Sequence, residues 1–216
     1  TLTVTSVEES MVVHSITLQA SQSLPSYEDA LRAWQQKGYK QSSKTIRVEA
    51  ENAAFKSAQS IYMLNDRTSP VDSPYDYKAI RYNTIGADKW QMPGQWIEWD
   101  ITVPESGLYA ISLRYRQNLK SNDVSSRTLY IDNAIPFQEA QSLEFHYNSS
   151  WQMESLGEKQ VKGGYLFYLS EGLHTLRMEV TLGRYSTIVK DVKESILALN
   201  DIYRSIAMIT GYIPDM

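Results

Sequence analysis

Two glutamates separated by a single residue form the first pair in this chain whose spacing suggests chemistry. Glu49-Ala-Glu51 lies at the end of the stretch 44–50, which we expect to be a strand, and positions i and i+2 of a strand point to the same side. Two carboxylates held so close repel each other unless a cation, a basic side chain or water compensates them. Calcium prefers oxygen ligands, so Glu49 and Glu51 are candidate ligands of a structural calcium ion. The alternative is a solvated edge, or an ion pair with Arg47 or another basic residue.

A second group of candidates lies between residues 75 and 96, in a stretch rich in loops and aromatic side chains. A sugar site combines a ring that stacks on the apolar face of a pyranose with amides or carboxylates that bind its hydroxyls. The candidate sugar-binding residues are Tyr75, Tyr77, Tyr82, Trp90, Gln91 and the outward-pointing Trp96. The alternative is that these rings pack together to bury the loops. For Trp90 the two interpretations are equally supported, whereas for each tyrosine packing is favoured over a sugar site.

The remaining reactive residue types argue against an enzyme. Cysteine is absent, which excludes thiolate catalysis, zinc–cysteine sites and disulfides. The three histidines, His14, His146 and His174, lie in separate segments without catalytic or metal-ligand spacing, so we interpret each as structural. No glycine-rich phosphate loop is present, and no local motif favours a catalytic pair of carboxylates.

Charge and composition restrict the partners. The formal net charge of −4 argues against nucleic acid or an anionic membrane as the main partner. No run approaches the roughly eighteen apolar residues of a membrane helix, so we expect no direct membrane insertion in this segment. The 15 tyrosines and 5 tryptophans suit a β-sandwich and stacking against sugars.

The elements that must position these residues are mainly strands. From Lys44 onward the hydrophobic period is two, and clusters of Pro, Gly, Asn and Ser separate the segments. The expected strands are 44–50, 78–85, 95–103, 108–117, 127–132, 143–147, 165–169 and 173–182. Eight short strands with such turns predict a β-sandwich of the jelly-roll type.

Alternation within these strands predicts which side chains form the core. In 95–103, Trp99 and its alternating apolar neighbours face inward, whereas Trp96 faces outward. In 108–117, Tyr109 and Tyr115 face inward. Pro104-Glu-Ser-Gly107 has the residue order of a turn, so we expect 95–103 and 108–117 to form a hairpin.

Helical patterns flank the predicted sandwich on both sides. Residues 26–37 read as a helix with Ser26 as N-cap and Gly38 as the stop, after an expected strand at 11–18. Residues 187–209 carry a seam with heptad spacing, expected to pack against helix 26–37, against the first strand or against a partner chain: Val189, Val192, Ile196, Leu199, Tyr203 and Ile206. We therefore expect an N-terminal flank at 1–43, a sandwich domain at 44–185 and, at 186–216, a C-terminal helix that leads to a further domain of a larger protein.

Five stretches together resemble carbohydrate-binding modules of families 6 and 35, which share the galactose-binding-like jelly roll. Residues 46–53 are similar to the opening strand of the family with its Glu-Ala-Glu signature. The other stretches, in the order of the family, are 94–115, Leu129-Tyr-Ile-Asp-Asn133, Ser150-Trp-Gln152 and 169–176. Coverage is about residues 44–182.

This resemblance implies glycan binding without catalysis, and a structural calcium ion near Glu49 and Glu51. The family closes with a strand that adds an Asp to the calcium site, whereas this chain continues from Leu182-Gly-Arg-Tyr185 into a helix. The family's ligand loops are its most variable part, so the resemblance transfers none of the loop aromatics. Trp151 matches a tryptophan that is structural in the family.

The C-terminal stretch, Ile206 to Asp215, resembles the segment before the solute-binding domain in surface-anchored sugar-transport proteins of Gram-positive bacteria. This resemblance implies an extracellular, cell-surface protein of a bacterial ABC transporter for sugar uptake. Its partners would then be an oligo- or polysaccharide and the rest of its own chain. The alternative function is a structural spacer or interaction domain without a glycan site.

Overall fold

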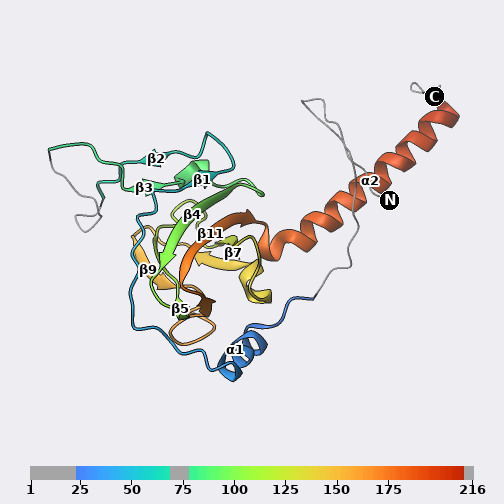
Figure 1. The fold of residues 1–216 in the computed structure, drawn as a ribbon. Coiled ribbons are helices and arrows are strands. Elements are labelled where there is room, and N and C mark those ends of the chain that lie inside the picture. Colours follow the sequence, from blue (N-terminus) through green and yellow to red (C-terminus); the bar gives the residue numbers. More distant parts are fainter. Residues whose placement is uncertain (1–22, 69–77, 212–216) are drawn as a thin grey trace, which may run out of the picture.

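The fold is mainly β, with a helix on either side of the strands, as the sequence predicts (Figure 1). The computed structural model describes residues 23–68 and 78–211, so the strand expected at 11–18 lies outside the described residues. The strands are β1 (Phe55–Lys56), β2 (Met63–Leu64), β3 (Thr84–Ile85), β4 (Trp96–Val103), β5 (Gly107–Ala110), β6 (Ser112–Tyr115), β7 (Val124–Ile131), β8 (Leu143–His146), β9 (Gln152–Ser155), β10 (Leu166–Leu169) and β11 (Gly172–Thr181). The helices are α1 (Tyr27–Gln36), α2 (Ser186–Thr210) and the short 3-10 helices η1 (Ala87–Lys89), η2 (Gln138–Gln141) and η3 (Gly183–Tyr185).

Two layers of antiparallel strands form the sandwich. One layer is a five-stranded sheet in the order β1-β4-β11-β7-β8. The other contains the pairs β10-β5 and β6-β9, and only Ile111 separates β5 from β6. The carbonyl oxygen of Ile111 accepts a 2.9 Å hydrogen bond from the amide of Leu156, which links the two pairs. A separate hairpin, β2-β3, lies beside the sandwich.

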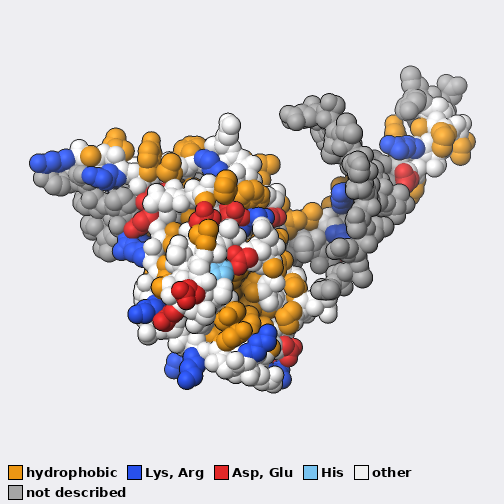
Figure 2. Space-filling view, viewed as in Figure 1, with side chains coloured by type: hydrophobic (Ala, Val, Ile, Leu, Met, Phe, Trp, Pro, Cys, Tyr) orange, Lys and Arg blue, Asp and Glu red, His pale blue; other side chains and the backbone are white. Residues whose placement is uncertain are grey.

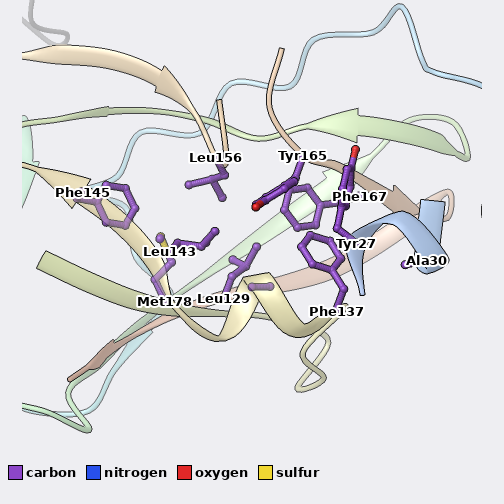
Figure 3. Close-up of a cluster of buried hydrophobic side chains, with 11 residues drawn as sticks. Tyr27, Ala30, Leu129, Phe137, Leu143, Phe145, Leu156, Tyr165, Phe167 and Met178 are labelled. Atoms are coloured by element: carbon purple, nitrogen blue, oxygen red, sulfur yellow. The ribbon is translucent and has the colours of Figure 1, made fainter. Parts of the chain in front are cut away.

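The core lies between the layers, where the alternating apolar side chains of the strands meet. Figure 3 shows its main cluster, in which Leu129, Phe137 and Phe167 are fully buried. Trp99 and Tyr115 pack against this cluster, and Tyr109 belongs to a second, smaller one, so all three face inward as predicted. Alternation in a half-buried strand is sufficient to predict these faces.

Helix α1 closes one end of the sandwich. The hydroxyl of Ser26 accepts a hydrogen bond from the amide of Asp29, which is the predicted N-cap interaction. Tyr27 packs against the rings of Phe137 and Tyr165, at centroid distances of 5.1 and 4.6 Å. The predicted helix 26–37 is therefore confirmed, and its buried face belongs to the same core as the sheets.

The strand expected at 44–50 is wrong, because these residues run as irregular chain that ends in a turn. The amide of Asn52 donates a 3.0 Å hydrogen bond to the carbonyl oxygen of Glu49. Val48 is 41% exposed, and only Ile46 packs against the core. A segment with one buried side chain gains too little from packing to hold a sheet register. The strand expected at 78–85 is likewise reduced to β3.

The hairpin expected between 95–103 and 108–117 is also wrong. β4 pairs with β1 and β11, whereas β5 pairs with β10. The turn at 104–106 therefore passes the chain from one layer to the other. Alternation predicts which face of a strand is buried, but it does not identify the partner strand across a sandwich.

Helix α2 confirms the predicted helix 187–209, but its seam is not packed against α1. The six seam residues are between 46% and 65% exposed, and none of the helix's described residues is buried. Figure 1 shows α2 projecting from the sandwich, with α1 at another corner of the domain. No helix in the part of the chain that the structure describes combines the length and the apolar character needed to cross a membrane.

Candidate functional site

A shallow depression beside the hairpin β2-β3 brings together three of the predicted site residues. Its volume is about 420 Å³, and it is lined by Glu49, Glu51, Asn52, Met63, Ile80, Arg81 and Tyr82. Both predicted metal ligands and one predicted sugar-stacking ring therefore lie in a single concavity, which we call the Glu51 depression. Figure 2 shows hydrophobic side chains exposed along this upper part of the molecule.

The turn that carries the two glutamates is fixed to the five-stranded sheet from both sides. The indole Nε1 of Trp99 donates a 2.8 Å hydrogen bond to the carbonyl oxygen of Ala50. The amide of Ala54 donates a 2.9 Å hydrogen bond to the carbonyl oxygen of Glu98 on β4. Because the inward-facing Trp99 reaches the residue between the glutamates, a core side chain determines where the two carboxylates lie.

Glu51 is the most constrained polar side chain of the depression. It is only 7% exposed, and its Oε2 atom is buried without a hydrogen-bond partner. Burial raises the pKa of Glu51, and the charge of Glu49 raises it further, whereas its own backbone amide and Arg47 act in the opposite direction. An unpaired buried carboxylate oxygen is costly, so this position favours a cation or a ligand hydroxyl that would satisfy it.

Glu49 has the basic partner that the alternative interpretation requires. Nε and Nη2 of Arg47 both lie 3.0 Å from Oε1 of Glu49. The arginine side chain is 69% exposed, and such surface pairs contribute only about 0–1 kcal/mol to stability. Among the described residues no group of three or more Asp, Glu or His side chains could hold a metal ion. A calcium ion here would therefore take its other ligands from Asn52, the backbone and water.

Tyr82 supplies the exposed ring of the depression. It is 58% exposed, and Ile80, two residues before it, is 76% exposed. The neighbouring residue Asn83 is held firmly, because its amide side chain exchanges two 2.8 Å hydrogen bonds with the backbone of Asp66. The exposed ring is thus attached to a fixed stretch of backbone, which limits the entropy lost when a ligand stacks on it.

Trp90 lies in a different environment, which favours the packing alternative. The guanidinium carbon of Arg127 lies 4.3 Å from the centre of the Trp90 ring, and the ring packs against the main core cluster. Its Nε1 donates a 3.2 Å hydrogen bond to the carbonyl oxygen of Gln95. The side chain of Gln95 accepts from the amide of Gln91, which is exposed and does not line the Glu51 depression. Burial lowers the pKa of Arg127 to about 10.

Trp96 points outward from β4 as predicted, but an arginine covers it. The guanidinium of Arg177 lies 4.8 Å from the centre of the Trp96 ring and 5.7 Å from that of Tyr130. Nε of Arg177 also donates a 2.8 Å hydrogen bond to Glu98, which faces it across the sheet. The remaining two predicted aromatics, Tyr75 and Tyr77, lie outside the described residues.

Of the two histidines in the described residues, His174 has the more extensive contacts, and these contacts are structural. Nδ1 lies 2.6 Å from Oδ2 of Asp132, and Nε2 lies 2.9 Å from the carbonyl oxygen of Ser170 and 3.2 Å from its hydroxyl. The three side chains thus meet as in a nucleophile–base–acid arrangement. However, Nε2 faces a carbonyl acceptor, and a ring nitrogen that donates there does not take a proton from serine.

Sequence reasoning did not identify Asn52, Met63, Ile80 or Arg81 as neighbours of the glutamates. The available signal was position alone, since Asn52 follows Glu51 directly and Ile80 and Arg81 precede Tyr82. The approach of residues 49–52 and 80–82 depends on the hairpin β2-β3, which has two residues in each strand. Two residues are too few to show the alternation by which a strand is recognised in a sequence.

No family model matches the chain, and no curated protein matches it. Solved structures do resemble it. A Paenibacillus cycloisomaltooligosaccharide glucanotransferase complexed with cycloisomaltoheptaose shares 22% identity at a TM-score of 0.45, over 71% of this chain and 20% of that one. A family 35 carbohydrate-binding module from Clostridium thermocellum shares 16% identity at a TM-score of 0.40, and the match covers 57% of this chain and 80% of that module. A Podospora anserina GH26-CBM35 β-(1,4)-mannanase shares 14% sequence identity at a TM-score of 0.41, and the match covers 63% of this chain and 24% of the mannanase. The chain thus spans about a fifth of the glucanotransferase, and the last two structures belong to, or contain, the family that the sequence motifs resemble.

Proposed function

We propose that this domain binds a glycan at the Glu51 depression and catalyses no reaction. The observation that carries the proposal is the pairing of an exposed ring, Tyr82, with a buried carboxylate, Glu51, whose Oε2 has no protein partner. A pyranose offers the complement of this surface, because its C–H face is apolar and its hydroxyls donate hydrogen bonds. Tyr82 would stack on that face while Asn52 binds hydroxyls at the ring's edge.

The proposal includes a structural calcium ion at Glu49 and Glu51. The buried, unpaired Oε2 of Glu51 supports it, since a hard divalent cation is the compensator that such an oxygen favours. When bound, calcium supplies positive charge that removes the repulsion between the two carboxylates. The protein's own contribution is to hold both carboxylates on one rigid turn, through Trp99 and Ala54.

The wider setting we propose is an extracellular protein on a bacterial cell surface, in a sugar-uptake ABC transporter. Support for this setting comes from the sequence of the C-terminal stretch, Ile206 to Asp215. There the domain would hold an oligo- or polysaccharide close to the solute-binding part of its own chain. The net charge of −4 agrees with a glycan partner rather than a nucleic acid.

A structural spacer is the second candidate function. The observations that favour it are the packed state of Trp90 and Trp96 beneath arginines and the exposed seam of α2. In that case the sandwich would only separate its neighbours, and the seam would dock a partner helix.

Affinity electrophoresis and glycan-array binding of the purified 216-residue protein decide between the two. We expect retention by at least one glycan, and we expect Tyr82→Ala to weaken it about five- to thirtyfold, the effect of one lost stacking contact. Tyr62→Ala is the matched control, because Tyr62 is 45% exposed on the neighbouring segment and does not line the depression. If no glycan retards the wild type, or if both variants behave alike, the spacer function replaces the glycan-binding one.

A further inference from the structure

The sandwich has a second concavity, on the side where strands β8 and β9 lie. β8 is the last strand of the five-stranded sheet, and β9 pairs with β6 in a two-stranded sheet. A cavity of about 300 Å³ opens between residues of these two strands, and η2 and the turn after β9 form its other walls. It shares no lining residue with the Glu51 depression, so the two concavities are separate.

The floor of this cavity is the apolar core itself. Phe145, Leu156 and Tyr165 line it, and each is buried to nine-tenths or more (Figure 3). Tyr115 completes the floor, with its ring edge-on to Phe145 at a centroid distance of 4.9 Å. The floor therefore offers a ligand the rings of two tyrosines and a phenylalanine together with aliphatic carbon.

The polar groups at the rim are hydrogen-bonded acceptors held in place by the fold. Oε2 of Glu154 accepts a 2.6 Å hydrogen bond from the hydroxyl of Tyr115, and its Oε1 lies 4.0 Å from Nζ of Lys159. Oε2 of Glu139 accepts a 2.8 Å hydrogen bond from the amide of Tyr27, at the start of α1. Each carboxylate is thus fixed through its Oε2, and one hydrogen bond uses only part of the acceptor capacity of a carboxylate.

The turn that forms one wall is also preformed. The amides of Gln160 and Val161 both donate to the carbonyl oxygen of Gly157, at 3.0 and 2.9 Å. Gly157 has a φ of 76°, and a Cβ atom there would lie 2.3 Å from the ring of Tyr165. Only glycine allows this turn to lie flat on the tyrosine, so the wall exists before any ligand arrives.

We infer that this cavity is a second carbohydrate subsite, which takes one pyranose unit without a carboxylate group. The size is at the lower end for ligand pockets, which suits a single ring. The apolar floor suits the C–H face of a pyranose, and the fixed oxygens of Glu154 and Glu139 suit its hydroxyls. Among its ionisable lining residues, Glu139, Glu144 and Glu154 outnumber Lys159, so a uronate or a phosphorylated sugar would be repelled.

The test is a titration of the folded protein with D-glucose, D-galactose and D-glucuronate. NMR monitors the chemical shifts of the Leu156 and Gly157 amides during each titration. We expect saturable shifts with a neutral sugar and much weaker binding of glucuronate. Glu154→Ala should weaken the neutral sugar's affinity about tenfold or more, which is the effect of losing a hydrogen bond to a charged group. Met153→Ala is the matched control, since Met153 is the preceding residue of β9, is 71% exposed and does not line the cavity.

Further variants separate this subsite from the proposed one and from a folding defect. Tyr82→Ala should leave the shifts at Leu156 and Gly157 unchanged, whatever it does to the Glu51 depression. If Glu154→Ala lowers the melting temperature, Glu154→Gln retains an acceptor for Tyr115 and should still weaken binding about threefold. The inference is overturned if no neutral sugar shifts these amides, if glucuronate binds as tightly, if Tyr82→Ala abolishes the shifts, or if both Glu154 variants bind like wild type.

Discussion

His174 and Asp132 join two turns of the sandwich through a hydrogen bond of 2.6 Å between Nδ1 and Oδ2. Asp132 lies in the tight turn after β7, where its φ of 50° is in the left-handed region that aspartate tolerates. His174 lies on β11, and its second ring nitrogen reaches the carbonyl oxygen of Ser170 before that strand. The imidazole therefore connects the turn after β7 with the turn between β10 and β11, where the chain passes from one sheet to the other.

This contact predicts a pH-dependent contribution to stability. Burial lowers the pKa of His174, but its bonds to Asp132 and to the Ser170 carbonyl outweigh burial, so the pKa lies above the ordinary value. The stabilisation is therefore fully present below the unfolded-state pKa of about 6.5 and is lost as the pH rises through the folded-state pKa. Asp132→Asn retains an acceptor for the amide of Thr175 and removes the charge. We expect it to cost about 1–2 kcal/mol near pH 5 and less near pH 9, measured by urea unfolding. An equal loss at both pH values contradicts the assignment.

The environment of Trp90 predicts that it stabilises the fold. Trp90→Ala removes a ring that packs on the core and covers Arg127, so we expect a loss of about 3–5 kcal/mol in the free energy of unfolding. Trp99→Ala should behave in the same way, since Trp99 packs inward. Gln91→Ala, at the exposed neighbour, should cost less than about 0.5 kcal/mol. If the Trp90→Ala protein melts like wild type but loses glycan affinity, Trp90 stacks on the sugar and does not serve mainly to pack the core.

Calcium should stabilise the protein through Glu51. We expect an excess of calcium over chelator to raise the melting temperature by about 2–8 °C, because an ion that binds only the folded state adds to its stability. Glu51→Gln should abolish this increase and, without calcium, should itself stabilise the protein, since it removes a buried charge. Glu171→Gln, at an exposed carboxylate outside the depression, is the control. An increase that survives in Glu51→Gln places the ion elsewhere.

Two C-terminal truncations should distinguish the contribution of helix α2 to stability from that of η3. Ending the chain after Tyr185 removes a helix without buried described residues, so we expect the melting temperature to change by less than about 2 °C. Ending it after Leu182 also removes Arg184 and Tyr185, which both bond to Asp123, and should lower the melting temperature measurably. Equal melting curves for the two truncations contradict this division, and light scattering reports whether the seam associates chains.

The parts of the fold that sequence predicted are those with a local cause. Ser26 caps α1 because its hydroxyl accepts from Asp29 three residues on, which is visible in the sequence. The buried face of β4 follows from alternation around Trp99. By contrast, the pairing of β4 with β11 joins residues 69 to 83 positions apart, from Val103 with Gly172 to Trp96 with Glu179, and no local period specifies it. β9 was missed for a similar reason, because three of its four residues are polar and its inward Glu154 breaks the expected pattern.

The candidate site was predicted only in part, for the same physical reason. Glu49 and Glu51 were found because their spacing is local, although a turn rather than a strand brings them together. Tyr82 was one of five candidate aromatics, and sequence reasoning ranked every tyrosine below Trp90, because exposure depends on what packs above each ring and a sequence does not show it. Arg127 on β7 covers Trp90, and Arg177 on β11 covers Trp96. Both arginines are distant in sequence from the tryptophans they cover.

Helix α2 also has a mechanical consequence. Its 25 residues form a rod about 37 Å long that begins directly at η3. A rod of this length amplifies small rotations at its base, and a tilt of about 10° moves its far end by about 6 Å. Arg184 and Tyr185, both bonded to Asp123, lie at this pivot. Three side chains at the surface of the sandwich therefore set the direction in which the helix points, and with it the position of anything attached to its end.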